Sequence, residues 1–276
     1  MVTAMFDNIS LGRYYPGQSA LHRLDPRTKL IAAIVIMVIV FLVRGLWPML
    51  AIALLTGLLI LASRVPVKIV LSGLKPMLLI LIFAFLLNLL TVPGGKVWFA
   101  WGPLTVTEAG FLTAIRMTAR LAFLIMNTTL MLTLTTTPIM VADATENLMA
   151  PLKKIRFPVH EMAMMMSIAL RFVPTLLEET DKIMKAQSSR GADYDTGGLI
   201  SKARGLVSVL IPLFVSSFKR AEDLAVAMEA RCYRGGEGRT RLKSLAYTRL
   251  DLLFFAGLLG AGAVVLALEF ALPATV

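Results

Sequence analysis

Apolar runs separated by short polar breaks fill most of this chain, and the pattern predicts helices that span a membrane. Five runs are long and almost free of charge, at residues 30–43, 46–62, 77–92, 111–135 and 250–272. A hydrocarbon core about 30 Å thick needs roughly 20 helical residues to cross it. The first two runs are a little short, so we expect flanking residues to extend them into a helical hairpin around Arg44 and Gly45.

Two polar stretches between the runs have recognisable local roles. Asp25 is suited to cap a helix and Pro26 to occupy its first position, so the first helix should begin there. Residues 97–107 are expected to form a non-helical connector. They contain Trp98 and Trp101, a residue type that is enriched at membrane interfaces.

The fourth run carries two arginines, which are costly at the depth of a bilayer. Arg116 and Arg120 are four residues apart and therefore share one helical face. A charged side chain there costs on the order of 2.5–3.5 kcal/mol on insertion scales. Either the two side chains snorkel to the outer interface, or they form a polar face that lines a cavity or pairs within the bundle. The sequence leaves both interpretations open.

Residues 138–249 have a different pattern, in which apolar and polar positions alternate at helical spacing. A short amphipathic helix is predicted at residues 138–151, and two long ones follow. The apolar series of the first long helix is Met162, Met165, Ala169, Phe172, Leu176 and Ile183. That of the second is Leu206, Leu210, Leu213, Ser217, Ala221, Leu224 and Met228. Each long helix should have roughly 30 residues, or about 45 Å at the rise of an α-helix.

Both long helices end in a short motif centred on an arginine. The first ends in Ser189-Arg190-Gly191 and the second in Ala230-Arg231-Cys232. A cation in the last turn interacts favourably with the helix dipole, and glycine suits the position just beyond a helix. From spacing alone, helix capping is a sufficient explanation of both arginines, and a binding role is the alternative.

Composition favours an integral membrane protein without a catalytic centre. The chain has 276 residues, of which 57% are hydrophobic and 16% charged, and a mean hydropathy of +0.77. Soluble domains usually contain about a quarter charged residues. One cysteine and two distant histidines give no metal-site spacing. The motifs of nucleotide-binding loops, serine hydrolases and metalloproteases are absent from the sequence.

The net charge of +11 indicates topology rather than a nucleic-acid partner, because the basic residues are unevenly placed. They gather in the N-terminal segment, in residues 63–76 and above all in residues 138–249. The other two loops have one each, Arg44 and Lys96. Cytoplasmic loops of membrane proteins are enriched in lysine and arginine. The N-terminus is therefore predicted to be cytoplasmic.

These patterns predict an all-α integral membrane protein with about five transmembrane helices and a cytoplasmic domain. Residues 1–28 should form a cytoplasmic N-terminal segment and residues 29–135 four transmembrane helices. Residues 136–249 should form a domain of one short and two long amphipathic helices. Residues 250–272 should form the fifth transmembrane helix.

The paired arginine motifs resemble those of the transmembrane T component of energy-coupling-factor (ECF) transporters, which are bacterial ABC-type importers of vitamins and other micronutrients. The resemblance covers nearly the whole chain. It is carried by Pro16-Gly17, Leu21 to Lys29, Ala169 to Pro174, Ala186 to Asp193 and Ala227 to Tyr233. The family usually has Ala-Arg-Gly at both tips, so Ser189 and Cys232 each depart from it at one position. A third match, Ala203-Arg204-Gly205, begins the second helix and is taken as a coincidence.

The resemblance implies a non-catalytic coupling subunit in the membrane of a bacterial cell. In the family, the tips that correspond to Ser189-Arg190-Gly191 and Ala230-Arg231-Cys232 dock in grooves on two ATPase subunits. The T component also holds a substrate-binding S component within the lipid bilayer. ATP and magnesium would then be bound by the partner ATPases, and this chain would need no cofactor and no nucleic acid.

Three alternatives remain open from the sequence. Within the ECF class, a shared vitamin-type module competes with a dedicated cobalt or nickel importer. A self-contained permease would be expected to show internal repeats or polar pore-lining residues, of which the spans have few. An intramembrane enzyme would need clustered aspartate, glutamate or histidine at membrane depth, and the apolar runs lack such clusters.

Overall fold

The structure is a computed structural model that describes residues 14–101, 104–155, 157–192, 198–235 and 245–271. Residues 1–13 of the predicted N-terminal segment, Asp193 and Leu272 lie outside the described part. The chain divides into two compact units. The membrane unit comprises residues 12–144 and 244–276, and the helical-pair unit is built around residues 145–243.

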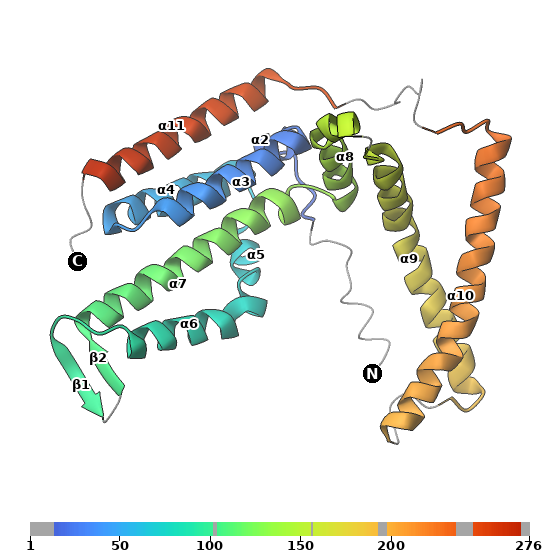
Figure 1. Cartoon of the computed structure of the whole chain (residues 1–276), viewed down its shortest axis with the longest axis horizontal. Helices are drawn as coiled ribbons and strands as arrows, with labels where there is room; N and C mark the ends of the chain where they lie inside the picture. The colour runs from blue at the N-terminus through green and yellow to red at the C-terminus, as the bar shows by residue number, and fades with distance from the viewer. Residues whose placement is uncertain (1–13, 102–103, 156, 193–197, 236–244, 272–276) are drawn as a thin grey trace. The chain divides into compact units, whose positions relative to one another are not determined.

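The membrane unit is helical except for one hairpin in its described part (Figure 1). Its helices, in chain order, are α2 (Ala20–Arg23), α3 (Pro26–Leu42), α4 (Leu46–Ser63), α5 (Val67–Ser72), η1 (Lys75–Met77), α6 (Leu78–Thr91), α7 (Glu108–Thr128), the π-helical segment η2 (Thr129–Leu134) and α11 (Arg249–Ala271). Helix α3 begins as predicted, with Pro26 in its first turn and the Asp25 carboxylate accepting from the amide of Arg27 at 2.9 Å.

Four stretches are long and apolar enough to cross a membrane: Leu46–Ser63, Val67–Thr91, Glu108–Leu134 and Arg249–Ala271. They contain four of the five predicted spans. The remaining predicted span, residues 30–43, lies mostly in α3. This helix has 17 residues, which is the lower limit of length for a transmembrane helix. The chain is therefore an all-α, multi-pass membrane protein.

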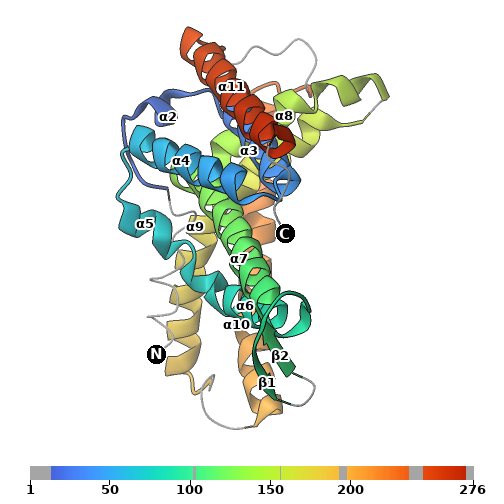
Figure 2. The ribbon, with the colours of Figure 1, turned by 90° about the vertical axis from the view of Figure 1, so that its left-hand side faces the viewer.

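Helix α3 is the most enclosed helix of the membrane unit. It packs against α7, η2 and α11, while α4 packs against α7 and α11 (Figures 1 and 2). Its buried side chains include Ala32, Ile36, Ile39 and Val40, which recur at helical spacing. The approach of α11 is close, since a Cβ atom added to Gly262 would lie 2.6 Å from Cδ1 of Ile39. Most outward-facing side chains of α4, α6 and α11 are large and apolar, as lipid contact requires.

The connector between α6 and α7 is an antiparallel hairpin, which agrees with the prediction that it is not helical. Strand β1 (Val97–Trp101) pairs with β2 (Leu104–Thr107), with Val97 opposite Thr107. Thr107 also starts α7, because its hydroxyl accepts from the amide of Gly110 at 3.1 Å. The same hydroxyl donates to the carbonyl of Val92 at 2.9 Å and so joins the two ends of the connector.

Helix α8 (Pro138–Leu148) carries the chain from the membrane unit into the helical-pair unit. There, η3 (Ala150–Ile155) leads to two long helices, α9 (Val159–Ser189) and α10 (Leu199–Ala230). They have 31 and 32 residues, which confirms the predicted pair of long amphipathic helices. Each continues through an internal proline, Pro174 in α9 and Pro212 in α10.

Candidate functional site

Helices α9 and α10 lie against each other in antiparallel directions. Glu179 of α9 accepts hydrogen bonds from the hydroxyl of Ser216 and, at 2.7 Å, from the guanidinium of Arg220. Beyond this clamp, a groove of about 240 Å³ lies between the helices. Its lining includes Ile168, Phe172 and Leu176 of α9 and Ala221, Leu224 and Met228 of α10. Along the contact, residue numbers therefore increase in α10 where they decrease in α9. The colours of Figure 1 accordingly run in opposite directions along the two helices.

This pairing places the two arginine motifs at opposite ends of the helical pair. Measured from the Glu179–Arg220 clamp, Arg190 lies towards one end of the pair and Arg231 towards the other. At 1.5 Å per residue the two distances along the helices are about 16 Å and about 22 Å from Glu179 and Ser216. The two tips are therefore separated by roughly 40 Å along the pair.

The tip of α9 is closed by main-chain hydrogen bonds of the Schellman type. The amide of Gly191 donates to the carbonyl of Ser188 at 3.0 Å, and the amide of Ala192 donates to that of Gln187 at 3.0 Å. Gly191 has a φ of +88°, the left-handed conformation that this motif requires. Arg190 is the last residue before the bend.

The tip of α10 has the same geometry, although a cysteine takes the place of glycine. The amide of Cys232 donates to the carbonyl of Glu229 at 2.8 Å, and that of Tyr233 donates to Met228 at 3.0 Å. Cys232 adopts a φ of +58°, so the bend is made without glycine. Arg231 stands at the position that Arg190 occupies in α9.

The side chains of both arginines are exposed, and the described residues offer them no hydrogen bond or ion pair. Since the amides beyond each tip bond the last carbonyls, hydrogen-bond capping does not use the guanidinium groups. Ser189 and Ala230, which precede the arginines, are exposed as well. Each tip therefore presents an exposed guanidinium group. By contrast, Arg204 lies within the first turns of α10 and ends no helix.

Arg116 and Arg120 occupy the middle of α7 and have different partners. Arg120 donates from Nη2 to the carbonyl of Val43, where α3 ends. The Nε of Arg116 donates at 3.3 Å to the carbonyl of Leu112 in its own helix. Near Val43, a carboxylate oxygen of Glu269 accepts from the amides of Arg44 and Gly45 at 3.1 and 2.9 Å, and so caps α4. The role predicted for the two arginines stays a prediction.

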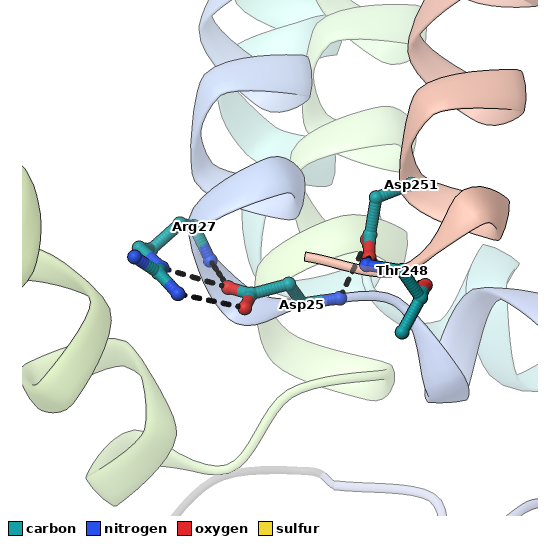
Figure 3. A network of polar contacts seen from close by, with 4 residues as sticks. All are labelled: Asp25, Arg27, Thr248 and Asp251. Carbon is teal, nitrogen blue, oxygen red and sulfur yellow. Dashed lines mark hydrogen bonds and ion pairs between the residues drawn. The ribbon is translucent and has the colours of Figure 1, made fainter. Parts of the chain in front are cut away.

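The N-terminal motif forms a polar network with the start of α11 (Figure 3). The Asp25 carboxylate accepts from Nε and Nη2 of Arg27, and this hydrogen bonding raises the pKa of Arg27. The amide of Asp25 donates to Asp251 at 2.7 Å. Asp251 also accepts from the amide and hydroxyl of Thr248 at 2.8 and 2.7 Å.

Sequence reasoning identified Asp25 as a cap but missed Asp251. The signal that could have found it is the spacing of Thr248 and Asp251, because a threonine followed three residues later by an acidic residue is typical of a capping box. The bond to Asp25 could not be found in this way, since it joins residues 226 positions apart.

Comparison with known proteins gives a consistent family assignment. The profile of the CbiQ family, described as cobalt transport protein, matches residues 17–242. The chain is 55% identical over 249 residues to the energy-coupling factor transporter transmembrane protein EcfT of Ruminiclostridium cellulolyticum, covering 90% of this chain and 92% of the relative. It is 46% identical over 273 residues to EcfT of Acidaminococcus fermentans, covering 98% and 100%.

A third relative, EcfT of Bacillus subtilis, is 50% identical over 247 residues, which is 90% of this chain and 93% of the relative. The matched range includes the N-terminal motif and both arginine tips. The chain therefore belongs to the CbiQ family and is an EcfT-like T component of an ECF transporter.

Proposed function

We propose that this chain is the non-catalytic coupling subunit of an ECF-type importer in a bacterial cell membrane. It would link ATP hydrolysis by two cytoplasmic ATPase subunits to the uptake of a vitamin or other micronutrient through a membrane S component. The observation that carries the proposal is the pair of equally built arginine tips at opposite ends of α9 and α10.

The separation of the tips supports two docking partners rather than one. Tips roughly 40 Å apart along the pair cannot enter one groove of a small domain. Each tip presents an exposed guanidinium on a bend that main-chain hydrogen bonds hold in place. Arginine forms bidentate, charge-assisted bonds to carboxylates. Two ATPase subunits with one acidic groove each would satisfy Arg190 and Arg231.

An apolar stripe on α10 supports a third partner in the membrane. Ile211, Phe214, Val215 and Phe218 are all exposed and recur at one-face spacing. The rings of Phe214 and Phe218 stack with their centroids 6.3 Å apart. Apolar surface of this kind is typical of a protein or membrane contact. In the proposed function it would contact the S component or the inner surface of the bilayer.

A dedicated cobalt or nickel importer is the second candidate, and the description of the matched family favours it. The printed names of the relatives, which mention no metal, favour the general ECF type. The two can be separated by purifying the transporter from its native cells and identifying the S component and the small molecule that it holds.

The tips are tested by reconstituting the chain with its ATPases and S component in vesicles. Changing both Arg190→Ala and Arg231→Ala removes hydrogen bonds worth roughly 1.5–3 kcal/mol each when one partner is charged. We expect ATPase co-purification or uptake to fall at least about tenfold, while membrane insertion is unchanged. Arg204→Ala is the matched control and should have little effect. Full uptake by the double variant would exclude the proposal.

A further inference from the structure

Lys29, in the first turn of α3, is the largest of the fully buried side chains, with 1% of its surface exposed. Its ammonium group donates to the carbonyl of Thr135 at 2.7 Å and to that of His22 at 3.3 Å. The lysine thus joins three segments of the membrane unit: the N-terminal segment, α3 and the end of α7 with η2. The function proposed above gives it no role.

Stability alone does not explain a lysine at this position. None of the ion pairs among the described residues includes Lys29. The nearby carboxylates have other partners, Arg27 for Asp25 and Thr248 for Asp251. Asp251 and Asp25 lie near enough to stabilise the charge of Lys29, but neither forms an ion pair with it among the described contacts. Burying an ammonium group that has no directly bonded carboxylate is costly, and an apolar side chain of similar size would fill the same space at lower cost. The lysine is therefore suited to hold a particular atom, the Thr135 carbonyl oxygen.

The Thr135 carbonyl lies where the chain leaves the last turn of η2 and continues towards α8. The last carbonyls of a helix have no partner within the helix. Here the N-terminal segment and the first turn of α3 each supply a partner for one of them. The amide of Tyr15 donates to Leu134 at 3.0 Å, and Lys29 donates to Thr135. A cation at a helix C-terminus is also favourable for the helix dipole. Beyond Thr137, α8 leads directly into the helical-pair unit.

The segment held in this way is π-helical, a rare form that is frequent at functional sites. In η2 the side chains of Leu130, Met131 and Leu134 are buried. The hydroxyls of Thr135 and Thr136 both donate to the carbonyl of Met131, at 2.9 Å each. When a π-helical turn becomes α-helical, its hydrogen bonds move from the fifth residue to the fourth, so the turn contains about one residue fewer. The chain that follows would then rotate by about 100° about the helix axis.

We propose that Lys29 is a positioning residue that fixes the exit of α7 from the membrane unit. The inference rests on the coupling function proposed above. With the Thr135 carbonyl held, a displacement of α8 moves the membrane helices instead of being absorbed by a π-to-α change in η2. This assigns a task to the motif Leu24 to Lys29, in which Asp25 and Pro26 begin α3 and thereby place the lysine.

The test uses the complete transporter, the variant Lys29→Met and the control Lys68→Met. Methionine keeps the length of the stem and removes the three donors, and Lys68 is an exposed lysine of α5. Co-purification of the partners, ATP hydrolysis and uptake are measured together in vesicles. Hydrogen exchange of the backbone amides is measured on the same samples. Wild-type samples that fail to bind ATPases would refute the coupling function itself, separately from the role of Lys29.

For Lys29→Met we expect normal assembly and hydrolysis, with uptake per ATP lower by about tenfold, the scale of one lost hydrogen bond to a charged group. Exchange should accelerate in residues 131–141 and stay unchanged in α4 and α11. Lys29→Arg should restore part of the uptake, and Lys68→Met should match the wild type. A normal ratio of uptake to hydrolysis, or an even rise of exchange over all helices, would overturn the inference. If Lys29→Met does not reach the membrane, Lys29→Gln is measured in its place and judged by the same outcomes.

Discussion

At the scale of single residues, the two tips differ in how their bends are made. Gly191 adopts its left-handed conformation without penalty, whereas Cys232 at φ +58° does so against its Cβ atom. The left-handed region costs a non-glycine residue roughly 1–2 kcal/mol. The main-chain bonds to Glu229 and Met228 offset this cost. The bend of the α10 tip therefore carries backbone strain that the bend of the α9 tip does not.

We predict that Cys232→Val frays the tip of α10 and that Cys232→Gly does not. A β-branched side chain is poorly tolerated at positive φ, while glycine removes the strain. Hydrogen exchange of the amides of residues 232 and 233 should quicken roughly tenfold in the valine variant, as expected for a loss of 1–2 kcal/mol. Gly191→Val is the matched variant at the other tip. Equal exchange in the valine and glycine variants of residue 232 would contradict the prediction.

A second residue-scale prediction concerns the shape of the cation. Arg190→Lys and Arg231→Lys keep the charge but lose the planar fork that binds a carboxylate through two bonds. We expect each lysine variant to retain more ATPase binding than the corresponding alanine variant and less than the wild type. Binding is measured by titrating the purified ATPases onto the chain in nanodiscs. Lysine variants with wild-type affinity would show that only charge matters.

The residue pattern alone predicted the arginines and their place at helix ends, but it missed the state of other polar residues. Lys29 had no predicted role of its own, because it is one of several basic residues that cluster near the N-terminus. Its true partners are carbonyls, one of them 106 positions away. Such a contact depends on tertiary structure, and no local spacing reports it. For the same reason the left-handed conformation of Cys232 was not predicted, since its sequence neighbours favour either a bend or a longer helix.

At the scale of elements, the clamp of Glu179 with Ser216 and Arg220 fixes where α9 and α10 cross. The ion pair is only partly buried, with 39% of Arg220 and 20% of Glu179 exposed. Exposed pairs contribute about 0.2–1 kcal/mol, and the additional bond from Ser216 raises the total. The clamp can therefore hold the crossing angle between α9 and α10. Its contribution is small enough that a substitution can remove it without unfolding either helix.

We predict that Glu179→Ala loosens the crossing and leaves both helices intact. Spin labels on cysteines at Ser188 and Ala230, in a Cys232→Gly background, should give a distance of about 35 Å in the parent, from the helical rise. The distribution should broaden in Glu179→Ala. Lys185→Ala is the control, because its ion pair with Asp181 lies within α9 alone. A distribution that stays narrow in Glu179→Ala would show that apolar packing alone sets the crossing.

The helical period was enough to predict the existence, type and approximate length of α9 and α10. It did not predict that they are antiparallel, because an amphipathic face shows which side is buried but not against which partner. The clamp joins residues 41 positions apart and is invisible to local patterns. The π-helical form of η2 was also missed. The part of the apolar run 111–135 that forms η2, residues 129–134, continues the apolar pattern before it, and hydrophobicity does not distinguish hydrogen bonds to the fourth residue from those to the fifth.

At the scale of the whole molecule, topology stays a prediction that accessibility can test. Cysteines at Lys96 and Gly198, again in a Cys232→Gly background, should react differently with a reagent that does not cross membranes. Both positions are exposed, and Gly198 has open space around it. In intact cells we expect labelling at residue 96 only, and labelling at residue 198 after the cells are opened. Labelling at residue 198 in intact cells would show that the predicted orientation in the membrane is wrong.

The contact between Glu179 and Ser216 lies nearer to the tip of α9 than to the tip of α10, measured along each helix. If this contact acts as a fulcrum, the helical pair is a lever whose arm ending in Arg231 is about 1.4 times the arm ending in Arg190, by the helical rise. Two partners that closed through equal angles would move the tips by unequal amounts. The long arm would deliver the larger displacement and the short arm the larger force. Exchanging the partners between the two tips would therefore change the mechanics of the transporter even if both partners still bound.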